Sequence, residues 1–353
     1  MNLQQHRKAI DHLDAQIIRL LNRRTEHVLQ IGKLKQKGGR EVYSPQREQA
    51  VLERICRLNK GPLSADAIRA VYREIMSTAL AVEKPMTIAY LGPEATFTHQ
   101  AAMKRFGVSL NYVPLKTIAE VFHEVSKRRA DFGVVPIENS TEGVVTHTLD
   151  MFVDSDLKIV AQIVLPVQHC LLSRTTRQRI HRLYVHPQTL AQCRTYIQRN
   201  FAEAEIIETS SNARSAELAS GDRQSGAIAG LLAAEKYNLP VIEHDVQDSP
   251  GNATRFLVLG RECGPPSGND RTSIMFCISD RVGALYSALA PFRRYHINMT
   301  KIESRPSRRK AWEYYFFVDI DGHAQERRVS RALAQLAQQC VFVKVLGSYP
   351  NSD

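Results

Sequence analysis

The chain has 353 residues, of which 43% are hydrophobic and 24% charged, an ordinary globular composition with length enough for two or three domains. Its formal net charge of +11 indicates an anionic partner, which could be small acids or nucleic acid, but no nucleic-acid-binding motif accompanies the charge. No apolar run is long enough for a membrane span and the N-terminus has no signal-peptide core, so we expect a cytoplasmic protein without a membrane partner.

Residues 1–85 are predicted to be helical, ending at Pro85. Alternate steps of three and four give one stripe of a long first helix: Arg7, Ile10, Asp14, Ile17, Leu21, Arg24, Val28, Ile31 and Lys35. Its three cations either extend past the edge of the apolar face or compensate a bound anion. Arg7 and Lys35 would lie roughly 42 Å apart, too far to share one small ligand. If both serve one site, Arg7 must come from a second subunit, which predicts an intertwined homodimer.

Two further helices carry charged residues of interest. The second is predicted to begin with Ser44 as N-cap and Pro45 at its first position, which puts Arg47 and Glu48 in the first turn. The third begins near Ser64 and carries Glu83 on its apolar face. Because burial disfavours an ionised carboxylate, Glu83 could act as a protonated hydrogen-bond donor; alternatively it is a solvated helix-end residue.

Residues 86–262 alternate short apolar runs with helical segments, which predicts an α/β domain. Small polar residues gather at the junctions "GPEATFTHQ" (92–100), "PIENSTEG" (136–143), "SSNARSA" (210–216) and "GNATRF" (251–256). Such junctions are ordinary helix caps or sites for carboxylates. Thr254 follows a turn and precedes a buried strand, where its hydroxyl either makes a hydrogen bond within the turn or takes part in catalysis.

A Gly- and Pro-rich linker, "RECGPPSGND" (261–270), precedes the last predicted domain, residues 271–349. There the order strand, helix, strand, strand, helix, strand predicts a ferredoxin-like α+β unit. The six cysteines are scattered without metal-ligand or disulfide spacing, so we expect reduced thiols and no metal. Nucleotide-binding glycine motifs are missing too, and we expect no cofactor.

The helical region resembles the all-α chorismate mutase of the type fused to prephenate dehydratase. The resemblance implies that substrate is bound by Arg7 of the partner chain together with Arg24, Lys35, Arg47, Glu48 and Glu83. Lys35 and Glu83 would donate to the ether oxygen of chorismate as its bond breaks. The best-known member of the family has an aspartate where this chain has Ser44 and a glutamine where it has Glu83. We therefore expect a mutase that works only while Glu83 is protonated.

The segments "YLGPEATFTHQAA", "PIENSTEG" and "GNATRF" together resemble prephenate dehydratase, which implies a two-subdomain α/β fold like that of periplasmic binding proteins. The family's catalytic threonine falls on Thr254, which we expect to protonate the leaving hydroxyl, while Arg255 holds carboxylates. Other family positions thought to line the site are Glu138, Asn139, Ser140 and Gln192.

The C-terminal segments "GALYSAL" (283–289) and "IESRPS" (302–307) resemble an ACT regulatory domain. The resemblance implies that phenylalanine binds across a subunit interface and inhibits the enzyme, with the site formed by Gly283, Ala284, Leu285, Glu303, Ser304, Arg305 and Pro306. Feedback inhibition would follow if phenylalanine binds a less active state more tightly.

These resemblances imply a bifunctional enzyme of phenylalanine biosynthesis, an isomerase and a lyase, that converts chorismate to prephenate and prephenate to phenylpyruvate. An amino-acid sensor that has lost catalysis is an alternative, although the presence of Thr254, Arg24, Lys35 and Glu48 argues against it. Nucleic-acid binding driven by charge is another. Arogenate could also replace prephenate as the dehydratase substrate, and no residue decides between them.

Overall fold

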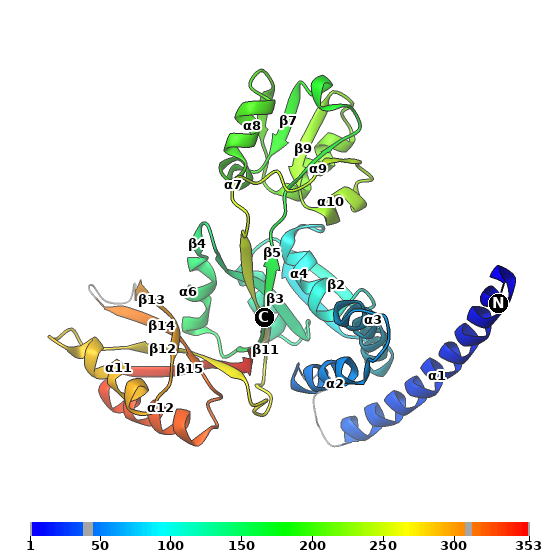
Figure 1. Cartoon of the computed structure of the whole chain (residues 1–353). Helices are drawn as coiled ribbons and strands as arrows, with labels where there is room; N and C mark the ends of the chain where they lie inside the picture. The colour runs from blue at the N-terminus through cyan, green and yellow to red at the C-terminus, as the bar shows by residue number, and fades with distance from the viewer. Residues whose placement is uncertain (1, 38–44, 308–312, 352–353) are drawn as a thin grey trace. The chain divides into compact units, whose positions relative to one another are not determined.

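The computed structural model describes residues 2–37, 45–307 and 313–351 and divides into two compact units. The first unit contains the chain up to Thr87 together with Phe106–Asn111, and the second contains Ile88–Arg105 and everything from Tyr112 onward. Figure 1 shows the helices and strands of both units. In the described part of the chain, none of the helices has the combination of length and apolarity that crossing a bilayer requires.

Three helices form the first unit: α1 (Leu3–Lys37), α2 (Pro45–Leu58) and α3 (Ala65–Glu83). The hydroxyl of Ser64 accepts from the Ala67 N–H at 3.1 Å and caps α3, as predicted, whereas the predicted cap Ser44 lies outside the described residues. The first half of α1 is exposed, and Ile10, Leu13 and Ile17 are 56%, 54% and 51% accessible. This apolar stripe is left uncovered by the described residues of the unit.

The second unit begins with a lobe built on one mixed sheet. Its strands run in the order β2 (Asn111–Leu115), β1 (Thr87–Leu91), β3 (Phe132–Asn139), β11 (Ala253–Gly260) and β5 (Lys158–Pro166), with β4 (Gly143–Val144) paired to β3. The helices that follow these strands are α4 (Phe97–Phe106), α5 (Ile118–Ser126) and α6 (Thr146–Asp154). We call this sheet and its helices lobe 1.

A second sheet, with strand order β10 (Val241–Glu243), β6 (Cys170–Ser173), β9 (Ser225–Ala229), β7 (Arg182–Val185) and β8 (Glu205–Glu208), forms lobe 2. Its helices are η1 (Arg177–Arg179), α7 (Pro187–Gln192), α8 (Arg194–Asn200), α9 (Asn212–Ser220) and α10 (Leu231–Lys236). The chain crosses between the lobes twice, after β5 and before β11, and the Val167 N–H joins the two crossings by donating to the Asn252 carbonyl at 2.8 Å (Figure 1). The predicted two-subdomain α/β architecture is therefore confirmed.

The C-terminal sheet has the order β13 (Met299–Pro306), β14 (Tyr314–Asp321), β12 (Asp270–Cys277) and β15 (Phe342–Pro350). Together with α11 (Ala284–Arg294) and α12 (Arg327–Gln339), it confirms the predicted ferredoxin-like order. One face of the sheet packs under these two helices through residues such as Phe276 and Val318.

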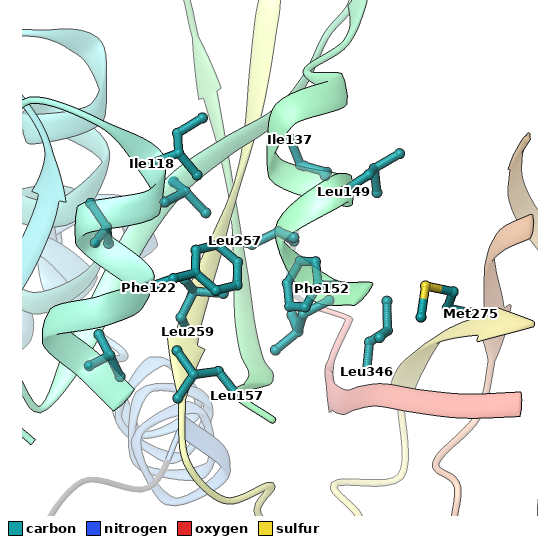
Figure 2. Close-up of a cluster of buried hydrophobic side chains, with 14 of the residues drawn as sticks. Ile118, Phe122, Ile137, Leu149, Phe152, Leu157, Leu257, Leu259, Met275 and Leu346 are labelled. Atoms are coloured by element: carbon teal, nitrogen blue, oxygen red, sulfur yellow. The ribbon is translucent and has the colours of Figure 1, made fainter. Parts of the chain in front are cut away.

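The opposite face of the C-terminal sheet belongs to the core of lobe 1. Met275 of β12 and Leu346 of β15 lie beside Leu149 and Phe152 of α6 in one buried cluster, which Figure 2 shows. The period of two along β12 explains how one strand serves both cores, because Met275 and Phe276 point to opposite faces. Lobe 1 and the C-terminal sheet therefore share a single apolar core.

Candidate functional sites

A cavity of about 670 Å³ opens among the three helices of the first unit. Five of the predicted residues line it: Arg24 and Lys35 of α1, Arg47 and Glu48 of α2, and Glu83 of α3. His27, Arg54 and Tyr72 also line the cavity and were not predicted. Arg54 lies two helical turns after Arg47, so the helical period contained a signal for it. The excess of cations suits an anionic ligand.

Lys35 of α1 and Glu83 of α3 contact each other in the wall of this cavity. The Lys35 Nζ lies 3.1 Å from the Glu83 Oε1, and the Glu83 side chain is only 5% exposed, so Glu83 is not a solvated helix-end residue. Gly32 leaves room for it, because a Cβ at Gly32 would lie 2.7 Å from the Glu83 Cγ. A glycine inside a helix costs about 1 kcal/mol relative to alanine, and here it lets the carboxylate lie against α1.

Arg7 is placed near the other end of α1 and is not among the residues that line this cavity in the described chain. The separation of Arg7 from Lys35 follows from the length of the helix, as the sequence predicts. A contribution from Arg7 would have to come from a second copy of the chain.

Thr254 lies opposite Asn139, where β11 and β3 pair antiparallel at their ends near lobe 2. The Asn139 Nδ2 donates to the Thr254 Oγ1 and to the Asn252 Oδ1, both at 2.9 Å. Its Oδ1 accepts from the backbone N–H groups of Thr141 and Glu142 at 2.9 and 3.2 Å. Backbone amides can only donate, so they fix the Asn139 amide with its NH₂ toward Thr254. The Thr254 oxygen is thus an acceptor here, and its own proton is not used in the bond to Asn139.

Ser140 fixes the backbone beside this pair. Its N–H donates to the Ala253 carbonyl at 2.9 Å, and its hydroxyl accepts from the Ala253 N–H at 3.0 Å. These bonds hold the chain that follows β3 against the beginning of β11, and they orient Ala253, the residue before Thr254.

Gln192, at the end of α7, connects lobe 2 to the loop after β3. Its Nε2 donates to the Glu142 carboxylate at 2.6 Å, and its Oε1 lies 3.0 Å from the Asn252 Nδ2 and 2.8 Å from the His169 Nε2. Gln192, Glu142 and Asn252 also line a pocket of about 280 Å³. Asn252 and His169 were not predicted, because their roles depend on contacts between distant segments.

Arg255 and Glu138 do not contact the group formed by Thr254, Asn139 and Asn252. Adjacent residues of a strand point to opposite faces, so Arg255 points away from Thr254 and Glu138 away from Asn139. The Arg255 guanidinium pairs with Asp319 of β14 at 2.7 Å and with Glu138 at 3.3 Å, and Glu138 also pairs with Lys301 of β13 at 2.8 Å. We call these four residues the interface ion cluster.

The N-terminus of α11 borders a cavity of about 470 Å³. The predicted Gly283, Ala284 and Leu285 line it, together with Asp280, Arg281, Tyr314 and Phe316. Gly283 has a φ of +76°, in the left-handed region that favours glycine.

The other four predicted effector residues lie on β13 and do not line this cavity in the described chain: Glu303, Ser304, Arg305 and Pro306. The Arg305 guanidinium instead pairs with Asp150 of α6 at 3.1 Å. Ser304 and Pro306 are exposed on the opposite face of the strand. Within one chain the two predicted halves of the effector site are therefore separate.

Three sequence families match successive parts of the chain: chorismate mutase type II over residues 6–84, prephenate dehydratase over 88–264 and the ACT domain over 272–338. The bifunctional chorismate mutase/prephenate dehydratase of Aquifex aeolicus is 47% identical over 355 residues, which cover 99% of this chain and 98% of that protein.

Two solved structures resemble the chain outside the mutase region. The prephenate dehydratase of Arthrobacter aurescens in complex with L-Phe is 33% identical with a TM-score of 0.70, over 75% of this chain and 90% of that one. A quorum-quenching acylase is 28% identical with a TM-score of 0.70, over 75% of this chain and 98% of that one.

Proposed function

Since the chain belongs to the family of bifunctional chorismate mutase/prephenate dehydratases, we propose that its helical unit converts chorismate to prephenate and that Thr254 acts in the conversion of prephenate to phenylpyruvate. The observation that carries the second assignment is the Asn139–Thr254 hydrogen bond, whose direction leaves the threonine proton available. The protein is an enzyme of phenylalanine biosynthesis with phenylalanine as its effector. Its six free cysteines suit a reducing compartment such as the cytoplasm.

The mutase reaction is an intramolecular rearrangement, so the site needs only to position and stabilise a dianion. Arg24 and Arg47 on the cavity wall can hold the two carboxylates. Lys35 and Glu83 are close enough to reach one ether oxygen, on which negative charge builds in the transition state. Of the two side chains, Lys35 carries its own donors, while Glu83 donates only through a carboxyl O–H.

The mutase site is completed by a second copy of the chain. The support is the exposed stripe on the first half of α1, where Ile10, Leu13 and Ile17 need an apolar surface to cover them. A partner helix packed along this stripe would place its own Arg7 near the far end of α1. A homodimer thus accounts for both the stripe and the sixth predicted residue.

Dehydration removes carbon dioxide and the ring hydroxyl of prephenate together. The electron pair of the breaking carbon–carboxylate bond enters the ring, the ring C–O bond breaks, and the hydroxyl leaves as water with a proton supplied through Thr254. Threonine is a weak acid, so aromatisation and decarboxylation provide most of the driving force. The Thr254 hydroxyl contributes a proton held in the right position.

The carboxylates of prephenate need a different partner from Arg255, which points to the interface ion cluster. The N-terminus of α9 is one: the Ser211 hydroxyl caps the Arg214 N–H at 3.1 Å and leaves the first two amides of the helix to bind an anion. The first residue of α9, Asn212, accepts from Thr189 of α7 at 2.7 Å. That bond ties α9 to the helix that carries Gln192.

Phenylalanine regulates the dehydratase through the C-terminal sheet. Asp280 and Arg281 line the cavity beside α11. The Asp280 carboxylate can pair with the ammonium group of an amino acid, and the Arg281 guanidinium can pair with its carboxylate. The signal has a short physical route, since the interface ion cluster joins β13 and β14 to Arg255 and Glu138, the direct neighbours of Thr254 and Asn139.

A time course on purified protein tests the proposal. Chorismate, prephenate and phenylpyruvate are quantified by chromatography with and without phenylalanine. Transient prephenate followed by phenylpyruvate, slowed by phenylalanine, is expected. Prephenate that accumulates would refute the dehydratase assignment and make arogenate the next substrate, while untouched chorismate would favour an amino-acid sensor.

A further inference from the structure

His169 lies in the first crossing between the lobes, between β5 and β6, and only 1% of its surface is exposed. Its Nε2 lies 2.8 Å from the Gln192 Oε1, and among the described residues its Nδ1 has no hydrogen-bond partner. Buried polar atoms are nearly always paired, so a histidine with one ring nitrogen bonded and the other unsatisfied calls for an explanation.

The proton on this imidazole can be located from the chemistry of its neighbours. The Glu142 carboxylate accepts from the Gln192 NH₂ at 2.6 Å. The Gln192 oxygen then faces His169, and it too only accepts. The His169 Nε2 must therefore carry the proton, which leaves the Nδ1 as the unprotonated, unsatisfied nitrogen of a neutral ring.

The opposite end of the network gives the same direction independently. The backbone amides of Thr141 and Glu142 turn the Asn139 NH₂ toward the Asn252 Oδ1. The Asn252 NH₂ must then point at the Gln192 Oε1, which lies 3.0 Å from it. Gln192 thus receives two donors on one oxygen, from Asn252 and from His169.

We propose that His169 is a positioning residue of the dehydratase, whose Nε2–H holds the Gln192 amide, and through it the Asn252 amide that accepts from Asn139 beside Thr254. The inference rests on the proposed role of Thr254. Without a donor at position 169, the Gln192 oxygen keeps only the bond from Asn252, so Gln192 and Asn252 are held less firmly beside the Asn139–Thr254 pair.

The surroundings of His169 suit a fixed, neutral donor. The backbone N–H of His169 donates to the Gln247 Oε1 at 2.9 Å, and its backbone carbonyl accepts from the Val246 N–H at 2.9 Å, so the segment that leads into the second crossing holds its backbone. The edge of the Phe97 ring packs against the imidazole with centroids 5.5 Å apart. Burial lowers the pKa of His169, and this outweighs the opposing effect of the hydrogen bond to Gln192.

Two substitutions separate donation from packing. His169→Gln keeps an N–H donor near the position of Nε2, whereas His169→Met has similar bulk and no donor. We expect kcat for prephenate dehydration to fall about tenfold or more in H169M, as for loss of a buried hydrogen bond, and to stay within about threefold in H169Q, with KM little changed in both. A kcat for H169M within twofold of the parent would overturn the proposal, and so would equal losses in the two variants.

A measurement on the unaltered protein does not depend on how the variants fold. With ¹⁵N-labelled histidine, the ring signals of His169, assigned by their absence in H169Q, should show the proton on Nε2 above pH 6.5. A proton on Nδ1 would overturn the proposal. The role of Thr254 is tested separately by Thr254→Ala, so failure of that role and failure of the His169 tautomer give different results.

Discussion

The Arg255 guanidinium lies 2.7 Å from the Asp319 carboxylate, and this contact joins the strand of Thr254 to the C-terminal sheet. Both side chains are largely buried, at 14% and 9% exposure. Asp319 is also held by the Ser273 hydroxyl at 2.6 Å, so the anion has little freedom to move away from Arg255 unless the sheet itself shifts. A displacement of β14 would therefore also displace Arg255, the residue next to Thr254.

Asp319→Asn should weaken this connection. Loss of a charged hydrogen bond is expected to lower the free energy of unfolding by about 1.5–3 kcal/mol and to raise the phenylalanine concentration needed for half-inhibition. Inhibition curves and denaturant unfolding measure the two effects. Asp321→Asn is the matched control, because this carboxylate on the same strand contacts Asn298 instead of Arg255. An unchanged half-inhibition concentration in D319N would rule out the ion cluster as the route of the signal.

Thr254→Ala should abolish phenylpyruvate formation, with a loss of about 100-fold or more in kcat, because alanine has no hydroxyl that could supply a proton to the leaving group. Thr254→Ser, which keeps a hydroxyl that Asn139 can orient, should retain part of the activity. Mutase activity in the same preparations serves as the internal control and should not change. Substantial dehydration by T254A would refute the role of Thr254.

Glu83→Gln should preserve mutase activity, because the amide of glutamine can donate a hydrogen bond to the ether oxygen in place of a carboxyl O–H. The control is Glu74→Gln on the same helix, whose carboxylate accepts from the Val108 N–H outside the cavity. The rate of chorismate loss measures the effect, and an inactive E83Q would contradict the prediction.

The second unit should lose stability on acidification. Burial lowers the pKa of both His99 and His169 below the ordinary value of 6.5. The unfolded chain therefore binds protons near pH 6.5 that the folded chain does not, and the free energy of unfolding falls as pH drops through 6.5 toward the lowered values. Above pH 6.5 both states are neutral at these residues, and the contribution to stability is constant.

Thermal unfolding of single variants isolates this effect. The His99 Nδ1 accepts from the Ala95 N–H at 3.1 Å, and His99→Asn keeps an acceptor there that cannot take up a proton. H99N should show a smaller drop in unfolding temperature between pH 7.5 and 5 than the parent, whereas the exposed His147→Gln should show the same drop. An identical drop in H99N would exclude His99 as a source.

Periodicity made most of the fold and the mutase cavity predictable. Arg24 and Lys35 share a helical stripe, so the sequence places them on one wall without knowledge of any other element. The period of two could also have shown that Thr254 and Arg255 point to opposite faces of β11. The partners of Arg255 and Glu138 could not be predicted, because Asp319 and Lys301 come from strands of another sheet. The same holds for His169 and Asn252, which meet Gln192 only once both crossings between the lobes are in place.

The core that Met275 and Leu346 share with Phe152 has a thermodynamic consequence. The C-terminal sheet cannot melt away from lobe 1 without exposing that lobe's own interior, so the two should unfold in one cooperative transition. A ligand that binds only the folded sheet then stabilises the catalytic lobe by the full RT ln(1 + [L]/Kd). Phenylalanine would in this way protect the very domain it inhibits against heat and proteolysis, so abundance of the end product would spare the enzyme while switching it off.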